Sequence, residues 1–376
     1  MRRVLGRAEA RARLIGASRL GARFPDGTDG ARAVLDALGC IQLDPIDRCG
    51  TNAELVAWAR VDGLARGDLH RALAGHTFEH FAKERCLLHP RFFPAYREQV
   101  RETHWWRGGE RANRVSAADL EEVLAELREG GPSIPQALSD RGRVEPLDWS
   151  GWKGTASRTA MALEVLWGQC RVVVSARDAR GRRVYDLPER ALGAWATAPA
   201  GADLVGDLVV ARVTVAGLLS RAAGPWWSVL AAARTDGTLD RLIAEGRLID
   251  VGVEGTSRRY LALPGDTPPA GPLAPRILGP LDPLVWDREL VRAVFDFTYL
   301  WEVYKPAAQR RWGYYVCPMV SGDGFAGRVE VVRSGEDLVV TGVWDDPDEA
   351  ELAEALARLA TANRCARVRW PSRSGA

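Results

Sequence analysis

Residues 171–187 read RVVVSARDARGRRVYDL, and this stretch decides the fold that the sequence predicts. Two runs that favour strands, 171–175 and 182–187, are joined by the turn-forming residues Asp178-Ala179-Arg180-Gly181. Three helical patterns precede them, at residues 120–127 (capped by Ser116), 134–138 and 158–167. Three helices followed by a strand hairpin is the order of a winged helix, a variant of the helix-turn-helix.

The next block of sequence repeats this order. We expect helices at 215–222, 227–232 and 239–245, then strands at 248–253 and 258–263, joined across Glu254-Gly255-Thr256-Ser257. Two successive copies of one unit indicate a tandem repeat. The first block has helical patterns at 8–14, 31–38 and 78–88, with Asn52 and Asp68 as caps of two further helices. We interpret it as a degenerate third copy.

The last third of the chain has a different pattern. Seven prolines lie within 264–283 and predict a linker. Strands are expected at 301–304, 313–318, 328–332, 338–343 and 366–370, with a helix at 349–360. The predicted fold is therefore α+β, with tandem winged helices followed by a β-rich domain. Its predicted parts are 1–112, 113–195, 204–263, the linker 264–280, and 281–376.

Composition sets the class of protein. The chain has 376 residues, 47% of them hydrophobic, and a net charge of +2, which neither demands nor excludes a polyanionic partner. The six cysteines are scattered without a CxxC pair, which argues against a zinc ribbon or a disulfide framework and fits a reducing compartment. We find no signal-peptide pattern and no apolar run of membrane-spanning length, and expect a cytoplasmic monomer without a cofactor or metal.

The stretch with the clearest chemistry is Cys40-Ile41-Gln42-Leu43-Asp44-Pro45, which follows a helical pattern that ends at Gly39. Apolar and polar residues alternate, so an extended backbone would place Gln42 and Asp44 on one face. Pro45 favours that extended backbone at Asp44. An amide and a carboxylate side by side are suited to holding a water molecule, although a solvated turn after a helix is the more ordinary interpretation.

Two further motifs do not support the chemistry that they suggest. His76-Thr77-Phe78-Glu79-His80 matches the H-x-x-E-H pattern of a metallopeptidase class, but Gly75 and Thr77 would leave His76 outside the expected helix. Residues 322–327 match G-x-G-x-x-G, but a strand pattern follows them where dinucleotide binding needs a helix. We predict a hairpin turn there.

Cations and aromatic residues gather in the run from Tyr304 to Tyr315, which we expect to form a hairpin loop. Phosphate contact with stacking would use this mixture, and a solvated loop whose aromatic residues serve the core explains it equally well. The predicted wings also carry arginines where winged helices contact DNA phosphates. The candidate DNA-binding residues are Lys305, Gln309, Arg310, Arg311, Trp312, Arg180, Arg182, Arg258 and Arg259.

Together these residues resemble the winged-helix DNA glycosylases of the AlkZ/YcaQ group. The resemblance covers nearly the whole chain and is carried by residues 41–44, 78–88, 151–153 (leading into the 158 helix), 184–190, 281–288 and 310–316. It implies tandem winged helices and a C-terminal β domain that enclose a DNA channel. Gln42-Leu43-Asp44 is similar to the Gln-hydrophobic-Asp motif of the YcaQ (AlkX) branch, whereas residues 47–53 differ from the segment that follows the motif in YcaQ.

The resemblance implies excision of N7-alkylated purines from double-stranded DNA, including the unhooking of interstrand crosslinks. Asp44 would activate water and stabilise the positively charged sugar, and Gln42 would position the same water. Because no lysine lies near the motif to form a Schiff base, we expect a monofunctional enzyme that leaves an abasic site. The alternative is a non-enzymatic winged-helix regulator, in which both residues form a structural turn.

Overall fold

The computed structural model describes residues 3–102, 108–145, 155–178, 180–265 and 271–370. The chain divides into two compact units. The first unit contains residues 1–72, 82–86 and 209–376, and the second contains residues 73–81 and 87–208. These units cut across the predicted boundaries, because the first joins both ends of the chain and the second begins inside the predicted N-terminal block. No described helix is long and apolar enough to cross a membrane.

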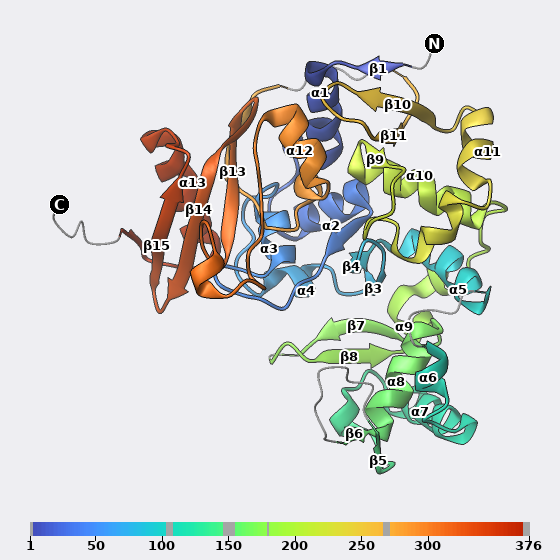
Figure 1. The fold of residues 1–376 in the computed structure, drawn as a ribbon. Coiled ribbons are helices and arrows are strands. Elements are labelled where there is room, and N and C mark those ends of the chain that lie inside the picture. The colour runs from blue at the N-terminus through green and yellow to red at the C-terminus, as the bar shows by residue number, and fades with distance from the viewer. Residues whose placement is uncertain (1–2, 103–107, 146–154, 179, 266–270, 371–376) are drawn as a thin grey trace. The chain divides into compact units, whose positions relative to one another are not determined.

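The first unit begins with helices packed on a small sheet (Figure 1). Its leading elements are β1 (Val4–Leu5), α1 (Arg7–Ser18), α2 (Gly27–Leu38), β2 (Cys40–Gln42), α3 (Asn52–Trp58) and α4 (Asp68–Ala72). Helix α2 ends at Gly39, whose positive φ of 72° suits the residue after a helix. The chain therefore turns directly from α2 into β2, which carries Gln42.

A winged helix occupies the middle of the first unit. It contains α10 (Leu204–Ala216) from Val209 onward, β9 (Leu219–Ser220), a 3₁₀ helix (Ser228–Arg234), α11 (Thr238–Ala244), β10 (Ile249–Val253) and β11 (Arg259–Ala262). The strands form one sheet in the order β1-β10-β11-β9, with β1 parallel to β10. Its apolar face packs with α1 and α12 (Arg288–Phe295) in a core that includes Leu5, Tyr260 and Leu290.

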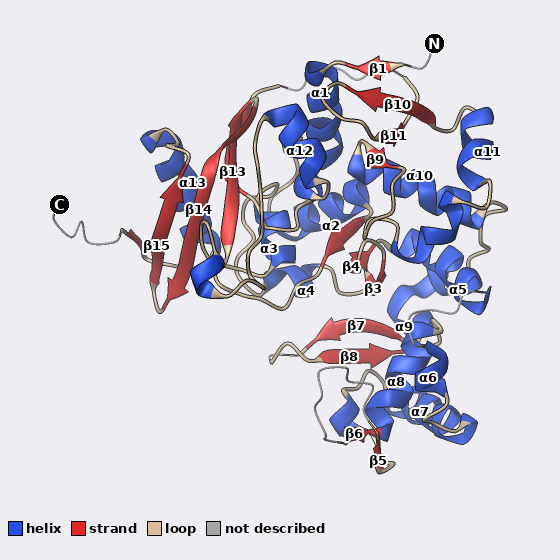
Figure 2. Cartoon of the chain, viewed as in Figure 1, coloured by secondary structure: helices blue, strands red, loops and turns tan. Residues whose placement is uncertain are grey.

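The C-terminal part of the first unit is a five-stranded sheet in the order β12-β13-β14-β15-β16, with α13 (Glu349–Ala362) beside it (Figures 1 and 2). The strands are β12 (Leu273–Ile277), β13 (Val316–Gly322), β14 (Gly324–Ser334), β15 (Asp337–Trp344) and β16 (Arg367–Arg369). The G-x-G-x-x-G match lies in the β13–β14 hairpin, as predicted. Residues 273–277, predicted as linker, are instead an edge strand.

The second unit contains the other winged helix. Its elements are β3 (Phe78–Phe81), a 3₁₀ helix (Pro90–Phe92), α5 (Phe93–Glu102), α6 (Gly108–Ala112), α7 (Ala117–Gly130), a 3₁₀ helix (Pro135–Ala137), β5 (Arg143–Val144), β6 (Ala156–Ser157), α8 (Arg158–Gly168), β7 (Val173–Arg177), β8 (Arg183–Asp186), α9 (Pro188–Leu192) and a 3₁₀ helix (Gly193–Ala196). Ser116 caps α7 as predicted, and its hydroxyl accepts from the amide of Asp119. Trp167 is buried in the core between α7, α8 and the β7–β8 wing.

Several local predictions were wrong. Residues 78–88 form the hairpin of β3 and β4 (Arg85–Leu88), not a helix, so the apolar residues that mimic helical spacing lie on two strands (Figure 2). Residues 301–304 are loop, not a strand. The helix predicted at 215–222 is also wrong, because α10 ends at Ala216 and Leu219–Ser220 form β9. The helix that begins at Asn52 is capped by Thr51, because Thr51 and Glu54 make a capping box.

Candidate active site

Gln42 and Asp44 lie at the exit of β2, in the first unit. Gln42 is the last residue of the strand and its side chain is buried, with 5% of the residue exposed. Asp44 follows outside the strand and is half-buried. The strand is fixed laterally because the amide of Leu43 donates to the carbonyl oxygen of Arg85 in β4 over 2.8 Å. The two polar residues therefore differ in exposure more than the alternating pattern predicts.

Asn52 ties this strand exit to a distant part of the chain. Its Nδ2 donates to the carbonyl oxygen of Gln42 over 2.8 Å, and its Oδ1 accepts from the amide of Leu281 over 3.0 Å. A Cβ on Gly279 would lie 2.4 Å from that Oδ1, so glycine is needed for this close approach. The segment after the linker is thereby held against the backbone of the Gln42 motif.

Lys83 contacts Gln42, and this contact corrects the expectation that no lysine is near the motif. Lys83 is at the tip of the β3–β4 hairpin, 6% exposed, and its Nζ donates to Gln42 Oε1 over 3.0 Å. The ammonium also lies 5.5 Å from the ring centroid of Trp286. Burial lowers the pKa of Lys83 to about 8. The sequence analysis does not identify Lys83 as a neighbour of the motif, because it is 41 positions from Gln42 in the chain.

The Asp44 carboxylate keeps one oxygen available. Oδ1 accepts from the amide of Ile46 over 2.9 Å, whereas Oδ2 has no hydrogen-bond partner among the described residues. Partial burial raises the pKa of Asp44 above its ordinary value, and the bond from Ile46 opposes that change. A half-exposed carboxylate with a raised pKa is a better proton acceptor than a fully solvated one.

Tyr315, the residue before β13, lies close enough to Asp44 for the two side chains to interact electrostatically. The tyrosine is fully buried, and its hydroxyl has no hydrogen-bond partner among the described residues. Burial and the neighbouring Cys317, Cys49 and Asp44 raise the pKa of Tyr315, so the hydroxyl stays protonated and can donate. It is a functional candidate that the sequence analysis missed, because its relation to Asp44 is purely three-dimensional.

The loop that precedes Tyr315 is held by two carboxylates. Glu302 accepts from Lys305 Nζ over 2.8 Å and from the amides of Arg311 and Trp312, each over 2.9 Å. Glu330 accepts from the amides of Tyr314 and Tyr315 over 2.7 and 2.8 Å. Residues 305–315 are thus an ordered loop with one 3₁₀ turn (Ala307–Gln309) before β13, not the predicted hairpin.

Arginine side chains gather at the aromatic residues of this loop. The guanidinium carbons of Arg48 and Arg310 lie 5.8 and 4.9 Å from the ring centroid of Tyr314, the residue before Tyr315. Arg311 lies 4.7 Å from the ring of Trp312 in the same way. Arg310 and Arg311 have no carboxylate partner among the described residues. The sequence analysis predicts Arg310 and Arg311 as DNA-binding residues, but it does not predict Arg48.

Three of the four candidate arginines on the wings, unlike Arg310 and Arg311, form ion pairs with carboxylates of the chain. Arg182 pairs with Asp178, Arg258 with Glu289, and Arg259 with Asp250 over 3.0 Å. Arg180 is exposed at the β7–β8 turn, and Gln309 is exposed in the 305–315 loop. Three of the predicted wing contacts therefore have their charge neutralised within the chain, which makes them weaker candidates for phosphate binding than the loop arginines.

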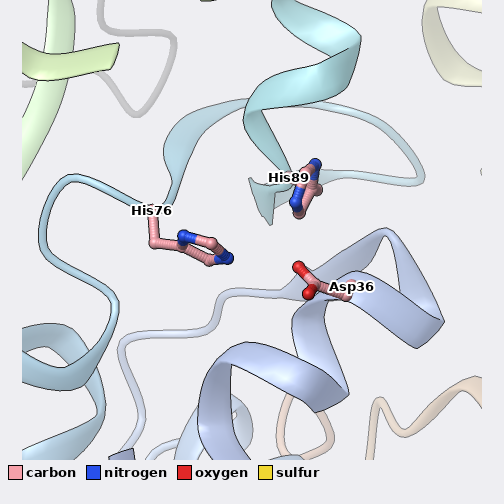
Figure 3. Close-up of side chains that lie close together, drawn as sticks. All are labelled: Asp36, His76 and His89. Atoms are coloured by element: carbon pink, nitrogen blue, oxygen red, sulfur yellow. The ribbon is translucent and has the colours of Figure 1, made fainter. Parts of the chain in front are cut away.

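The H-x-x-E-H match has no metallopeptidase geometry. Glu79 and His80 are consecutive residues of β3, so their side chains point to opposite faces of the strand. Glu79 pairs with Arg177, which donates to both carboxylate oxygens over 2.9 and 2.8 Å. His76 precedes the strand, and its ring lies edge-on to that of His89, with centroids 5.4 Å apart (Figure 3).

Comparison with known proteins identifies the family. The family model described as DNA glycosylase AlkZ-like matches residues 35–362. The chain belongs to the AlkZ-like DNA glycosylase family. It is therefore a DNA glycosylase that acts on DNA, and the match spans Gln42, Lys83, Asp44 and the 305–315 loop.

A solved structure shows the same fold. The chain is similar to the Streptomyces sahachiroi DNA glycosylase AlkZ, with 18% sequence identity and a TM-score of 0.62, over 98% of this chain and 99% of that one. The α+β class with winged helices and a β-rich C-terminal part is confirmed. Of the residues behind the family resemblance, Gly151-Trp152-Lys153 lies outside the described part of the chain.

Proposed function

We propose that the chain is a monofunctional glycosylase of the YcaQ (AlkX) branch that hydrolyses the N-glycosidic bond of N7-alkylated purines, including those in interstrand crosslinks. The observation that carries the proposal is a half-exposed carboxylate, Asp44, beside Gln42 and next to the cationic loop that ends at Tyr315. Gln42-Leu43-Asp44 matches the Gln-hydrophobic-Asp motif of that branch.

The chemistry follows from the charge of the substrate. Alkylation at N7 makes the purine cationic, so it leaves as a neutral base without a general acid. The enzyme must then stabilise positive charge on the sugar and deliver water to C1′. Asp44 accepts the proton of that water through its available Oδ2 and places negative charge beside the sugar, and Gln42 holds the water. Each contribution of this kind is typically worth about 10²–10⁴-fold in rate.

The monofunctional assignment rests on the state of Lys83. A lyase step would need a free amine to attack C1′, but Lys83 Nζ donates to Gln42 and is buried. We expect no covalent complex when wild-type protein and abasic DNA are mixed with borohydride. A trapped complex that disappears in Lys83→Met would contradict this assignment.

The proposed function is tested by abasic-site formation. A duplex with a single N7-methylguanine is incubated with the protein and then cleaved with alkali, and a matched duplex with guanine is the control. We expect cleavage at the methylated position only. Tight binding of both duplexes without cleavage would contradict the proposal and leave the regulator interpretation.

A further inference from the structure

We propose that Lys83 is a positioning residue that occupies the carbonyl oxygen of the Gln42 amide, so that Gln42 acts in the site as a hydrogen-bond donor through Nε2. This inference rests on the proposed function and adds a residue that the Gln-Leu-Asp motif does not contain. Its basis is the 3.0 Å contact between Lys83 Nζ and Gln42 Oε1 in a buried setting.

The orientation of the amide follows from the donor inventory. An ammonium has three donors and no acceptor, so the atom that Gln42 turns toward Lys83 must be its oxygen. The carbonyl oxygen of the Gln42 backbone is held separately by Asn52, which fixes the main chain on which the amide turns. With Oε1 occupied, the Nε2 group is the part of the side chain left to meet water or substrate.

This orientation divides the work between the two motif residues. Gln42 Nε2 donates to a lone pair of the water, and Asp44 Oδ2 accepts one of the water protons. The remaining lone pair is then free to attack C1′. An inverted amide would present a second acceptor, compete with Asp44 for the same protons and leave the water oxygen without a donor. Lys83 prevents that inversion.

The lysine itself is held by its surroundings. Trp286 lies against the ammonium, and the tryptophan Nε1 donates to the carbonyl oxygen of Leu281 over 3.0 Å. The charged or titratable groups around Lys83 are Cys86 and Glu84, which favour its charged form, and Arg288 and Arg212, which oppose it. Cys86 can titrate in the same range, because burial raises its pKa but Cys40 and Arg212 bring it down to about 7.

The first test is a double-mutant cycle in single-turnover excision of N7-methylguanine. A hydrogen bond to a charged group is worth a factor of about 10–100, so Lys83→Met is expected to slow excision by that factor while DNA affinity stays within about twofold. In a Gln42→Ala background the same substitution is expected to change the rate by less than about twofold, because the amide it orients is gone. Equal losses in both backgrounds would overturn the proposal.

The second test needs no activity and so separates this inference from the proposed function. The chain has only three lysines, Lys83, Lys153 and Lys305, so ¹³Cε-lysine NMR gives three signals, and Lys83→Met assigns the relevant one. We expect Lys83 to titrate near pH 8 in the wild-type protein. Its pKa should be lower in Gln42→Ala, because the acceptor is removed, and higher in Gln42→Glu, because a negative charge is added. Cys86→Ala controls for the neighbouring thiol. A Lys83 titration that ignores both Gln42 substitutions would overturn the proposal.

Discussion

At the scale of single residues, the sequence indicates Gln42 and Asp44 as candidates but not the residues that contact them. Alternation and Pro45 placed Gln42 and Asp44 together at a helix exit, because these are local rules of backbone geometry. The sequence patterns do not identify Lys83 and Tyr315, because the contacts of these residues with the motif depend on the folding of a hairpin and a sheet. Local patterns contain no information about such contacts.

The raised pKa of Asp44 gives a prediction for the pH dependence of excision. The base must be ionised to accept a proton, so the rate is expected to fall as pH decreases through a pKa above the ordinary aspartate value. Because N7-methylguanine is already cationic, the substrate itself adds no protonation step in this range. A single-turnover pH profile measures the acid limb. A rate that stays constant down to the ordinary aspartate pKa would show that Asp44 is not the base.

At the scale of elements, the 305–315 loop shows what composition alone can predict. The mixture of cations and aromatic residues indicated a contact surface, whereas the loop conformation depends on Glu302 and Glu330, which lie outside it. Similarly, residues 78–88 had helical spacing but pair as strands, because β4 is held to the exit of β2. Tertiary pairing overrides local periodicity in such short segments.

The loop arginines give a prediction about DNA binding. Replacing Arg310 and Arg311 with Ala is expected to weaken binding and to lower the slope of log affinity against log salt by about one for each lost phosphate contact. Arg367→Ala is the matched control, since Arg367 is exposed but pairs with Asp337 over 2.7 Å. An unchanged slope in the double variant would refute phosphate contact by this loop.

The buried ion pair of the first unit gives a prediction about stability. Arg60 donates to both carboxylate oxygens of Asp282 over 2.7 and 3.0 Å, and both side chains are fully buried. Asp282→Asn leaves the guanidinium without its charge partner, so we expect a loss of about 3–5 kcal/mol in the free energy of unfolding. Glu245→Gln, in the exposed pair with Arg241, should cost less than about 1 kcal/mol. Similar losses for the two variants in urea titrations would contradict this assignment.

At the scale of the whole molecule, the sequence predicted the winged helices but not how the chain is divided. Repeated helix–strand order is visible along a chain. The pairing of β1, near the N-terminus, with β10, about 250 residues later, is not visible there. The proline-rich segment also contains β12, an edge strand that contributes Leu273 to a core. Edge strands tolerate proline because one side of the strand needs no ladder bonds.

The second unit is predicted to lose stability in mild acid. Burial lowers the pKa of His80 to about 4, and its ring packs on Trp167 with centroids 5.1 Å apart. Histidine in the unfolded chain binds a proton near pH 6.5, whereas folded His80 does so only near pH 4. The free energy of unfolding is therefore expected to decrease by about 3 kcal/mol as pH falls from above 6.5 toward 4. Hydrogen exchange of α8 between pH 7 and 4 measures this change. His80→Phe should remove most of it, and an equal acid response in that variant would exclude His80 as the cause.

The proposed role of Asp44 is to activate the water that breaks the glycosidic bond. Its most direct test is single-turnover excision of N7-methylguanine by wild-type protein and Asp44→Asn, with DNA affinity measured in parallel. We expect a rate about 10²–10⁴-fold lower in the variant, with affinity within about twofold. Equal excision rates in the two proteins would contradict it.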